Sequence, residues 1–303
     1  MASDVRPDMR RDTDPAPRFA SVDRVLASQP TLRVWSVIVT VFGDSIVPRG
    51  GEVWLGTLSG ILAGLGIDDQ AVRAAVSRLT KDGWLARERV GRNAYYRLLD
   101  AAGQDFANAT DRIYGPEPAA YDGQACIATA RSAVQADPDR AANLIRAGWG
   151  RIAAGVFCRF GAGADPPEKG FVTLCGSLDA EDARALVSLA WDLADLAKAY
   201  NAFESSFTGL AHRGPEDFDD LESLLLRTLL IHAFRRVVLR DPMLPSDLMP
   251  KDWPGRRARR IAAALYQTLS PGAESWLDRH AVDCDGALTK DIAATQDRFV
   301  LVD

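Results

Sequence analysis

Residues 66 to 99 combine a helix pattern with a hairpin pattern, and this pairing constrains the fold more than any other part of the sequence. Asp68 or Asp69 can cap the start of the helix, because a side-chain oxygen there satisfies free backbone N–H groups. One side of this helix is apolar, with residues three and four positions apart: Val72, Ala75, Val76 and Leu79. The opposite side and its flank are polar and basic: Gln70, Arg73, Ser77, Arg78 and Lys81.

The hairpin follows over residues 84–98, with Gly91-Arg92-Asn93 at its apex. Arg89, Arg92 and Asn93 lie near the predicted tip, where we expect them to contact phosphates or the minor groove. Tyr95 and Tyr96 fit packing inside the hairpin better than stacking on bases, although both roles stay open.

A polar helix beside a basic two-stranded loop suits duplex DNA, since the helix fits the major groove and the loop reaches the backbone beside it. The preceding residues agree with this interpretation. The run from Leu32 to Phe42 is longer than most strands and predicts a buried helix, and a second helix is expected from about Val53 to Leu62 before a tight turn at Gly64-Leu65-Gly66. We therefore predict a winged helix-turn-helix domain over residues 29–114.

The other segments differ in composition. Residues 1–28 mix Asp, Arg and Pro with little apolar content, which predicts a disordered arm. Residues 115–205 alternate in the order β-α-β-β-α, with a long helix over 181–203, which predicts a ferredoxin-like central domain acting in dimerisation or as a spacer. Residues 206–303 are mostly helical. The predicted fold class is α+β with these three domains.

Charge is unevenly distributed along a chain whose net charge is −5. Residues 31–99 carry a local charge of +3, and residues 227–260 carry +6. The second basic segment also holds four prolines in thirteen residues, which fix an extended path around Trp253. Two basic segments in an acidic chain indicate two separate anionic partners, although a packed corner with surface arginines explains the second equally well.

Other classes of function find less support. The four cysteines are far apart and the histidines number three, so we expect no metal site and a reduced, cytoplasmic setting. Cys158 and Cys175 are expected to be small buried residues. No apolar run reaches the roughly 18 residues that a membrane helix needs. No catalytic Ser/His/Asp or Cys/His arrangement is recognisable. An acyl-CoA-dependent enzyme and an RNA-binding adaptor remain the alternatives.

The chain resembles the PaaX-type repressors of the phenylacetic acid degradation operon. The resemblance rests on motifs spread from about Leu32 to Trp276: Phe42-Gly43-Asp44, Pro48-Arg49-Gly50-Gly51, Val72 to Leu79, Asp82-Gly83-Trp84-Leu85, Gly91 to Tyr96, Trp191-Asp192-Leu193, His232-Ala233-Phe234-Arg235-Arg236, Leu239-Arg240-Asp241-Pro242, Leu244-Pro245, Leu248-Met249-Pro250 and Asp252-Trp253-Pro254-Gly255.

This resemblance implies a repressor, without a cofactor, that leaves its double-stranded operator when an aryl-CoA thioester such as phenylacetyl-CoA binds. We expect a homodimer on DNA, because one recognition helix reads too few base pairs for a genomic site. A CoA thioester has phosphates at one end and an apolar acyl group at the other, which arginines and an aromatic ring can hold. The expected effector-binding residues lie in the second basic segment: Arg235, Arg236, Arg240, Trp253, Arg256 and Arg257.

Overall fold

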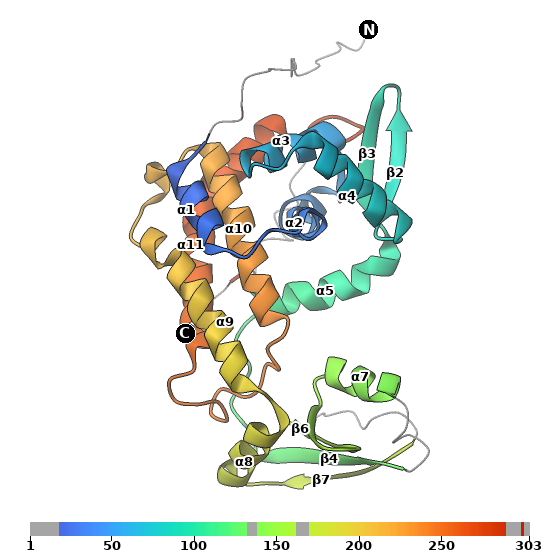
Figure 1. The fold of residues 1–303 in the computed structure, drawn as a ribbon, viewed down its shortest axis with the longest axis vertical. Helices are drawn as coiled ribbons and strands as arrows, with labels where there is room; N and C mark the ends of the chain where they lie inside the picture. The colour runs from blue at the N-terminus through green and yellow to red at the C-terminus, as the bar shows by residue number, and fades with distance from the viewer. Residues whose placement is uncertain (1–17, 132–137, 162–169, 289–297, 300–303) are drawn as a thin grey trace. The chain divides into compact units, whose positions relative to one another are not determined.

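The computed structural model describes residues 18–131, 138–161, 170–288 and 298–299 of the chain. It mixes helices with two antiparallel sheets, so the predicted α+β class is confirmed (Figure 1). Backbone contacts divide the chain into two compact units. Unit 1 comprises Met1–Gly115, Phe203–Arg236 and Arg259–Asp303, and unit 2 comprises Pro116–Ala202 and Val237–Ala258. The three predicted domain boundaries stay a prediction, since this division follows spatial contacts rather than consecutive segments.

The first part of unit 1 alternates short helices with three strands. Its elements are α1 (Ala20–Ser28), α2 (Val34–Val41), a π-helical turn η1 (Phe42–Ile46), a 3₁₀ turn η2 (Val47–Arg49), β1 (Glu52–Trp54), α3 (Leu55–Gly64), α4 (Asp69–Lys81), β2 (Leu85–Val90), β3 (Asn93–Leu98) and α5 (Asp100–Tyr114). The expected helix in the 32–42 run is confirmed as α2, whose Val37, Ile38 and Val41 are buried. The strands form a sheet in the order β1-β3-β2.

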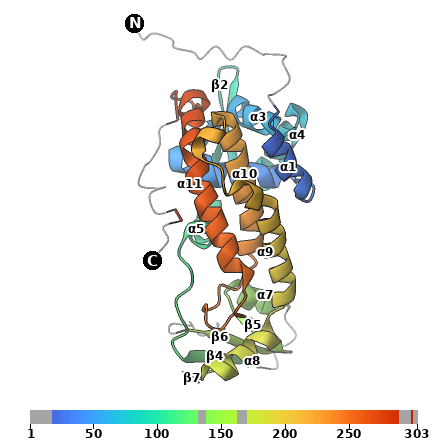
Figure 2. The same ribbon diagram turned by 90° about the vertical axis from the view of Figure 1, so that its left-hand side faces the viewer.

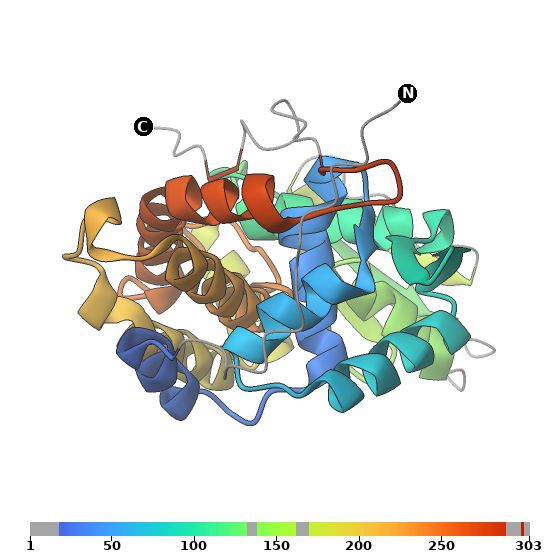
Figure 3. The same ribbon diagram turned by 90° about the horizontal axis from the view of Figure 1, so that it is seen from above.

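Two long helices supply the remaining framework of unit 1. Most of α10 (Asp220–Val238) and α11 (Pro254–His280) belongs to this unit, and the two helices lie side by side in Figure 2. Gly64 of α3 has no room for a side chain, because a Cβ there would come within 2.6 Å of the Leu225 side chain of α10. The segment after α11, red in Figure 3, returns to the blue part of the chain, where Trp54 donates its backbone N–H to Val282 at 2.9 Å. The β1–α3 segment therefore packs on α10 and on the segment that follows α11.

Unit 2 contains a four-stranded antiparallel sheet in the order β5-β6-β4-β7. Its elements are β4 (Gln124–Ala130), α7 (Pro138–Arg146), β5 (Gly150–Ala153), β6 (Val156–Phe160), β7 (Phe171–Ser177), α8 (Ala180–Ala190) and the first part of α9 (Leu193–Phe207). A small core joins the sheet to α7 through Ala128, Leu144, Trp149 and Phe157. This strand order is compatible with the expected ferredoxin-like layer and adds β5, which the sequence analysis did not predict.

The predicted long helix over 181–203 is wrong, because the chain breaks between α8 and α9. Trp191 is extended at φ −133° and ψ 136°, and its ring lies 6.0 Å from that of Phe160. Asp192 then accepts the backbone N–H of Asp195 at 3.3 Å in the first turn of α9. Tertiary packing of one aromatic ring outweighs the helical pattern here.

The predicted disordered arm is also wrong for residues 20–28, which form α1. Val22 and Val25 fall on one side of this helix and are buried, and Ser21 hydrogen-bonds to Glu222 of α10. Two apolar residues one turn apart are too weak a signal when they follow a polar segment. The rest of the predicted arm, residues 1–17, lies outside the described residues.

The cysteines only partly follow expectation. Cys158 is fully buried as predicted, and burial raises the pKa of its thiol to about 12. Cys175 is exposed rather than buried and forms a disulfide with Cys126, its direct partner across β4 and β7. The two residues are 49 positions apart, so only the strand register brings them together. The expectation of unpaired, reduced cysteines is thus wrong for this pair.

Among the described residues, no helix combines the length and the apolar character needed to cross a membrane.

Candidate nucleic-acid interface

α4 begins and ends where its sequence dictates. Asp68 is the residue that caps it, accepting the backbone N–H of Ala71 at 2.8 Å. Gly66 in the preceding turn has a φ of +74°, a conformation that suits glycine. The apolar side of α4 is buried as predicted, at Val72, Ala75, Val76 and Leu79. The helix packs through this side on α2 and α3.

The other side of α4 is open to solvent. All of its predicted DNA-binding residues are exposed: Gln70, Arg73, Ser77, Arg78 and Lys81. Arg73 donates from Nε to Asp69 at 2.6 Å, and Arg78 Nε lies 3.5 Å from Asp82. Asp69 also accepts the Ser59 hydroxyl at 2.6 Å, and this bond together with that from Arg73 lowers the pKa of its carboxyl group. Both ion pairs are solvent-exposed, so Arg73 and Arg78 can leave their aspartate partners for a phosphate or a base at little cost in free energy.

The hairpin of β2 and β3 pairs in register from Leu85 with Leu98 to Val90 with Asn93. Gly91 at the tip adopts a φ of +62°, as the tight turn requires. Arg89, Arg92 and Asn93 are exposed around this tip. Tyr95 and Tyr96 are only 8% and 5% exposed, so they pack within the sheet, and stacking on bases would require them to leave it.

A short connection fixes the hairpin against α4. Gly83 turns the chain at a φ of +77°, and Trp84 donates its backbone N–H to Leu79 of α4 at 2.9 Å. β2 packs on α4, and Figure 1 shows the two strands projecting as an arm next to this helix. Among the described residues, Lys81 and Arg92 form no ion pair and are therefore free for phosphate. The eight predicted residues thus lie on one helix and on the hairpin joined to it.

A buried charged cluster anchors the segment that follows α2. Asp44 pairs with Arg227 of α10 at 3.0 Å and with Arg298 at 3.2 Å, and it accepts the Tyr114 hydroxyl at 2.7 Å. Glu274 of α11 pairs with Arg227 and with Arg49, both at 2.6 Å. Both arginines lower the pKa of Glu274 to about 2 against the opposing effect of burial. These charges compensate one another within the core.

Sequence reasoning missed this cluster. Asp44 and Arg49 stand in motifs used for the family resemblance, but nothing local indicated that they are buried or that their partners lie about two hundred residues further along. A charged residue at the end of an apolar run, as at Asp44 after Phe42-Gly43, is the one available signal.

The predicted effector-binding residues do not all fall in one unit. Arg235 and Arg236 belong to unit 1, whereas Arg240, Trp253, Arg256 and Arg257 belong to unit 2. Four of the arginines are exposed: Arg236, Arg240, Arg256 and Arg257. Arg256 donates to the Ser246 carbonyl at 2.7 Å. Trp253 is 8% exposed, and its ring packs edge-on against Tyr200 at 5.8 Å, so it contributes to the core of unit 2.

Comparison with known proteins matches both ends of the chain. The family described as PaaX-like protein matches residues 33–102, and the PaaX-like protein C-terminal domain matches residues 191–279. The Transcriptional repressor PaaX of Escherichia coli is 32% identical over 276 residues, covering 84% of this chain and 85% of that protein. An uncharacterized protein of Mycobacterium tuberculosis, Rv0674, has a similar fold, with a TM-score of 0.55 at 20% identity over 81% of this chain and 99% of that one.

Proposed function

The chain belongs to the PaaX-like family of transcriptional repressors, which are regulators rather than enzymes, and we propose that it is a winged-helix repressor of phenylacetate catabolism. It binds a double-stranded operator through α4 and the β2–β3 hairpin. An aryl-CoA thioester, with phenylacetyl-CoA as the first candidate, releases it.

One observation carries the DNA-binding part of this proposal. The exposed side of α4 presents Gln70, Arg73 and Ser77 next to a hairpin whose tip presents Arg89 and Arg92. Arg and Gln side chains on a helix can read guanine and adenine edges in the major groove. Cations on the hairpin tip suit phosphates, which position a protein without reading sequence.

The effector part rests on the exposed arginines of the second basic segment. Arg236, Arg240, Arg256 and Arg257 can each present a planar guanidinium to phosphate oxygens. Release from DNA follows if the thioester binds the DNA-incompetent state more tightly than the competent one.

A homodimer is the expected DNA-bound form. One helix reads too few base pairs to define a genomic site, whereas a two-fold dimer reads two half-sites about one helical turn apart. Sedimentation of the complex measures this directly. One protein chain per duplex would contradict the dimer.

The function as a whole is tested by selecting duplexes from a random pool with the purified protein and measuring affinity by fluorescence anisotropy. We expect a palindromic sequence to be enriched and bound with steep salt dependence. Phenylacetyl-CoA should release it, whereas CoA and phenylacetate alone should be tested as controls. Failure to enrich any duplex sequence would refute the proposal.

A further inference from the structure

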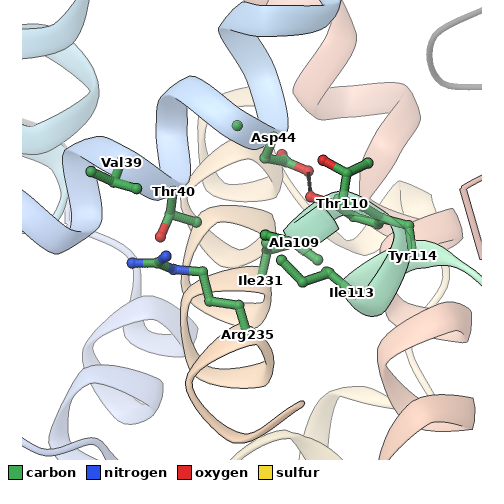
Figure 4. Close-up of a pocket in the computed structure, with 10 residues that line it drawn as sticks. Val39, Thr40, Asp44, Ala109, Thr110, Ile113, Tyr114, Ile231 and Arg235 are labelled. Atoms are coloured by element: carbon green, nitrogen blue, oxygen red, sulfur yellow. Dashed lines mark hydrogen bonds between the residues drawn. The ribbon is translucent and has the colours of Figure 1, made fainter. Parts of the chain in front are cut away.

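A small pocket lies in unit 1 between α2, α5 and α10 (Figure 4). It contains about 320 Å³ of empty space, including its open mouth. Apolar side chains form much of its wall, among them Val39 of α2, Ile113 of α5 and Ile231 of α10. Only about 40 Å³ of this space is open to a water molecule, well below the range of about 300–1,000 Å³ for small-molecule sites. An acyl group therefore enters only when the surrounding helices move apart, and an entire CoA molecule stays outside.

Arg235 gives this apolar pocket a partly buried positive charge. Its guanidinium donates to the Ser36 carbonyl and hydroxyl at 2.9 and 2.7 Å, and its Nε is buried without a hydrogen-bond partner. Burial lowers the pKa of Arg235 to about 10, which still leaves the side chain charged at neutral pH. Among the described residues no carboxylate lies within ion-pair distance of it. A buried N–H donor without an acceptor costs free energy unless a ligand or a water molecule accepts from it.

The other polar groups of the wall do not supply that partner. Asp44 is committed to Arg227, Arg298 and the Tyr114 hydroxyl. Thr40 lies 3.0 Å from Nδ1 of His232, which burial keeps neutral by lowering its pKa to about 3. Nε of Arg235 therefore has a free N–H donor in this pocket, and an oxygen atom of a bound ligand could accept from it.

We propose that this pocket binds a small apolar acyl group, aryl or branched, whose oxygen accepts a hydrogen bond from Nε of Arg235. The inference rests on the proposed function and deepens it by locating the acyl end of the effector. The oxygen belongs either to the carbonyl of a thioester, with the CoA part left outside, or to the carboxylate of the free acid.

The position of the pocket connects it with DNA binding. Its walls include α2, which packs directly on α4, and α5, which follows the hairpin. A ligand between α2, α5 and α10 favours the arrangement of these helices that accommodates it. If that arrangement differs from the one that binds DNA, occupation of the pocket lowers operator affinity.

The test uses the full-length protein and a pair of matched substitutions on α5. Ala109→Phe fills the pocket from its wall, whereas Ala107→Phe makes the same change at an exposed position of the same helix. Calorimetric titration measures binding of phenylacetyl-CoA, phenylacetate and CoA to each protein, and operator binding verifies that each variant is folded.

We expect the wild type and Ala107→Phe to bind phenylacetyl-CoA at least tenfold more tightly than CoA, and Ala109→Phe to bind the two equally. Arg235→Lys, which keeps the charge but lacks the planar fork, should lose much of the same preference. If the wild type binds phenylacetate but not phenylacetyl-CoA, the site belongs to the free acid.

If the Ala109→Phe protein binds operator and keeps the full preference for the acyl ligand, the pocket is not the acyl-binding site, and the proposed effector still stands. A wild type that binds operator but neither acyl ligand would overturn both the pocket and the effector, while DNA binding would stand.

Discussion

At the scale of single residues, Arg73 is the side chain that we expect to read a base. It lies in the middle of the exposed side of α4, held by Asp69 at 2.6 Å in the absence of DNA. We predict that Arg73→Ala weakens operator binding by about 1–3 kcal/mol, the worth of one bidentate base contact. Competition with random duplex in an anisotropy titration measures the loss of specificity. Arg24 is an exposed arginine on α1, and Arg24→Ala serves as the control. It should change the affinity neither for the operator nor for the random duplex. Equal losses on both duplexes would limit Arg73 to a phosphate contact.

His232 makes stability depend on pH. Burial, aided by Arg235 and Arg236, lowers its pKa from 6.5 to about 3, so the unfolded chain takes up a proton before the folded protein does. The stabilising contribution is complete above the unfolded pKa and is lost as the pH falls from about 6.5 toward 3. Glu274 adds a similar loss only below its ordinary pKa of 4.5.

We therefore predict that His232→Gln flattens the slope of unfolding free energy against pH between 6.5 and about 5, removing up to about 1.4 kcal/mol per pH unit. Urea unfolding at a series of pH values measures this slope. The exposed His212→Gln should keep the wild-type slope. The same slope in both variants would assign the pH dependence to other groups.

At the scale of elements, the β2–β3 hairpin is expected to contribute affinity without sequence preference. Arg92 stands at its tip, exposed and without an ion pair among the described residues. We predict that Arg92→Ala weakens binding to every duplex alike and reduces the slope of log affinity against log salt by about one. Affinities measured across a salt series give this slope. An unaltered slope would exclude a phosphate contact at Arg92.

Elements with strong local signals could be predicted from the sequence. α4 combines an Asp cap with helical spacing of Val72 and Val76, and the hairpin combines a glycine turn with alternating residues, so sequence neighbours alone determine both. α1, the break at Trp191 and the Cys126–Cys175 pair depend on partners far along the chain. The same limit applies to the candidate pocket, since only the fold brings Ala109 and Arg235 to one cavity.

At the scale of the whole molecule, the cluster around Asp44 joins three separate stretches of chain. Asp44 pairs with Arg227 and Arg298, and all three side chains are almost inaccessible to solvent. We predict that Asp44→Asn destabilises the protein by about 3–5 kcal/mol, because buried guanidinium groups lose their counter-charge. Asp195→Asn removes an exposed pair with Lys198 and should cost at most about 1 kcal/mol. Urea unfolding compares the two. Similar losses would mean that the cluster adds nothing beyond a surface ion pair.

The discontinuity of unit 1 also governs how the protein can be made. The ribosome releases α2 and α3 long before α10, on which they pack. At typical rates of elongation the intervening stretch takes on the order of ten seconds to synthesise, during which the apolar sides of the early helices lack their final partners. Unit 2 lies largely in that stretch and can fold meanwhile. We therefore expect the DNA-binding form only after α10 has been synthesised, and we expect a chain that ends before α10 not to compete for the operator.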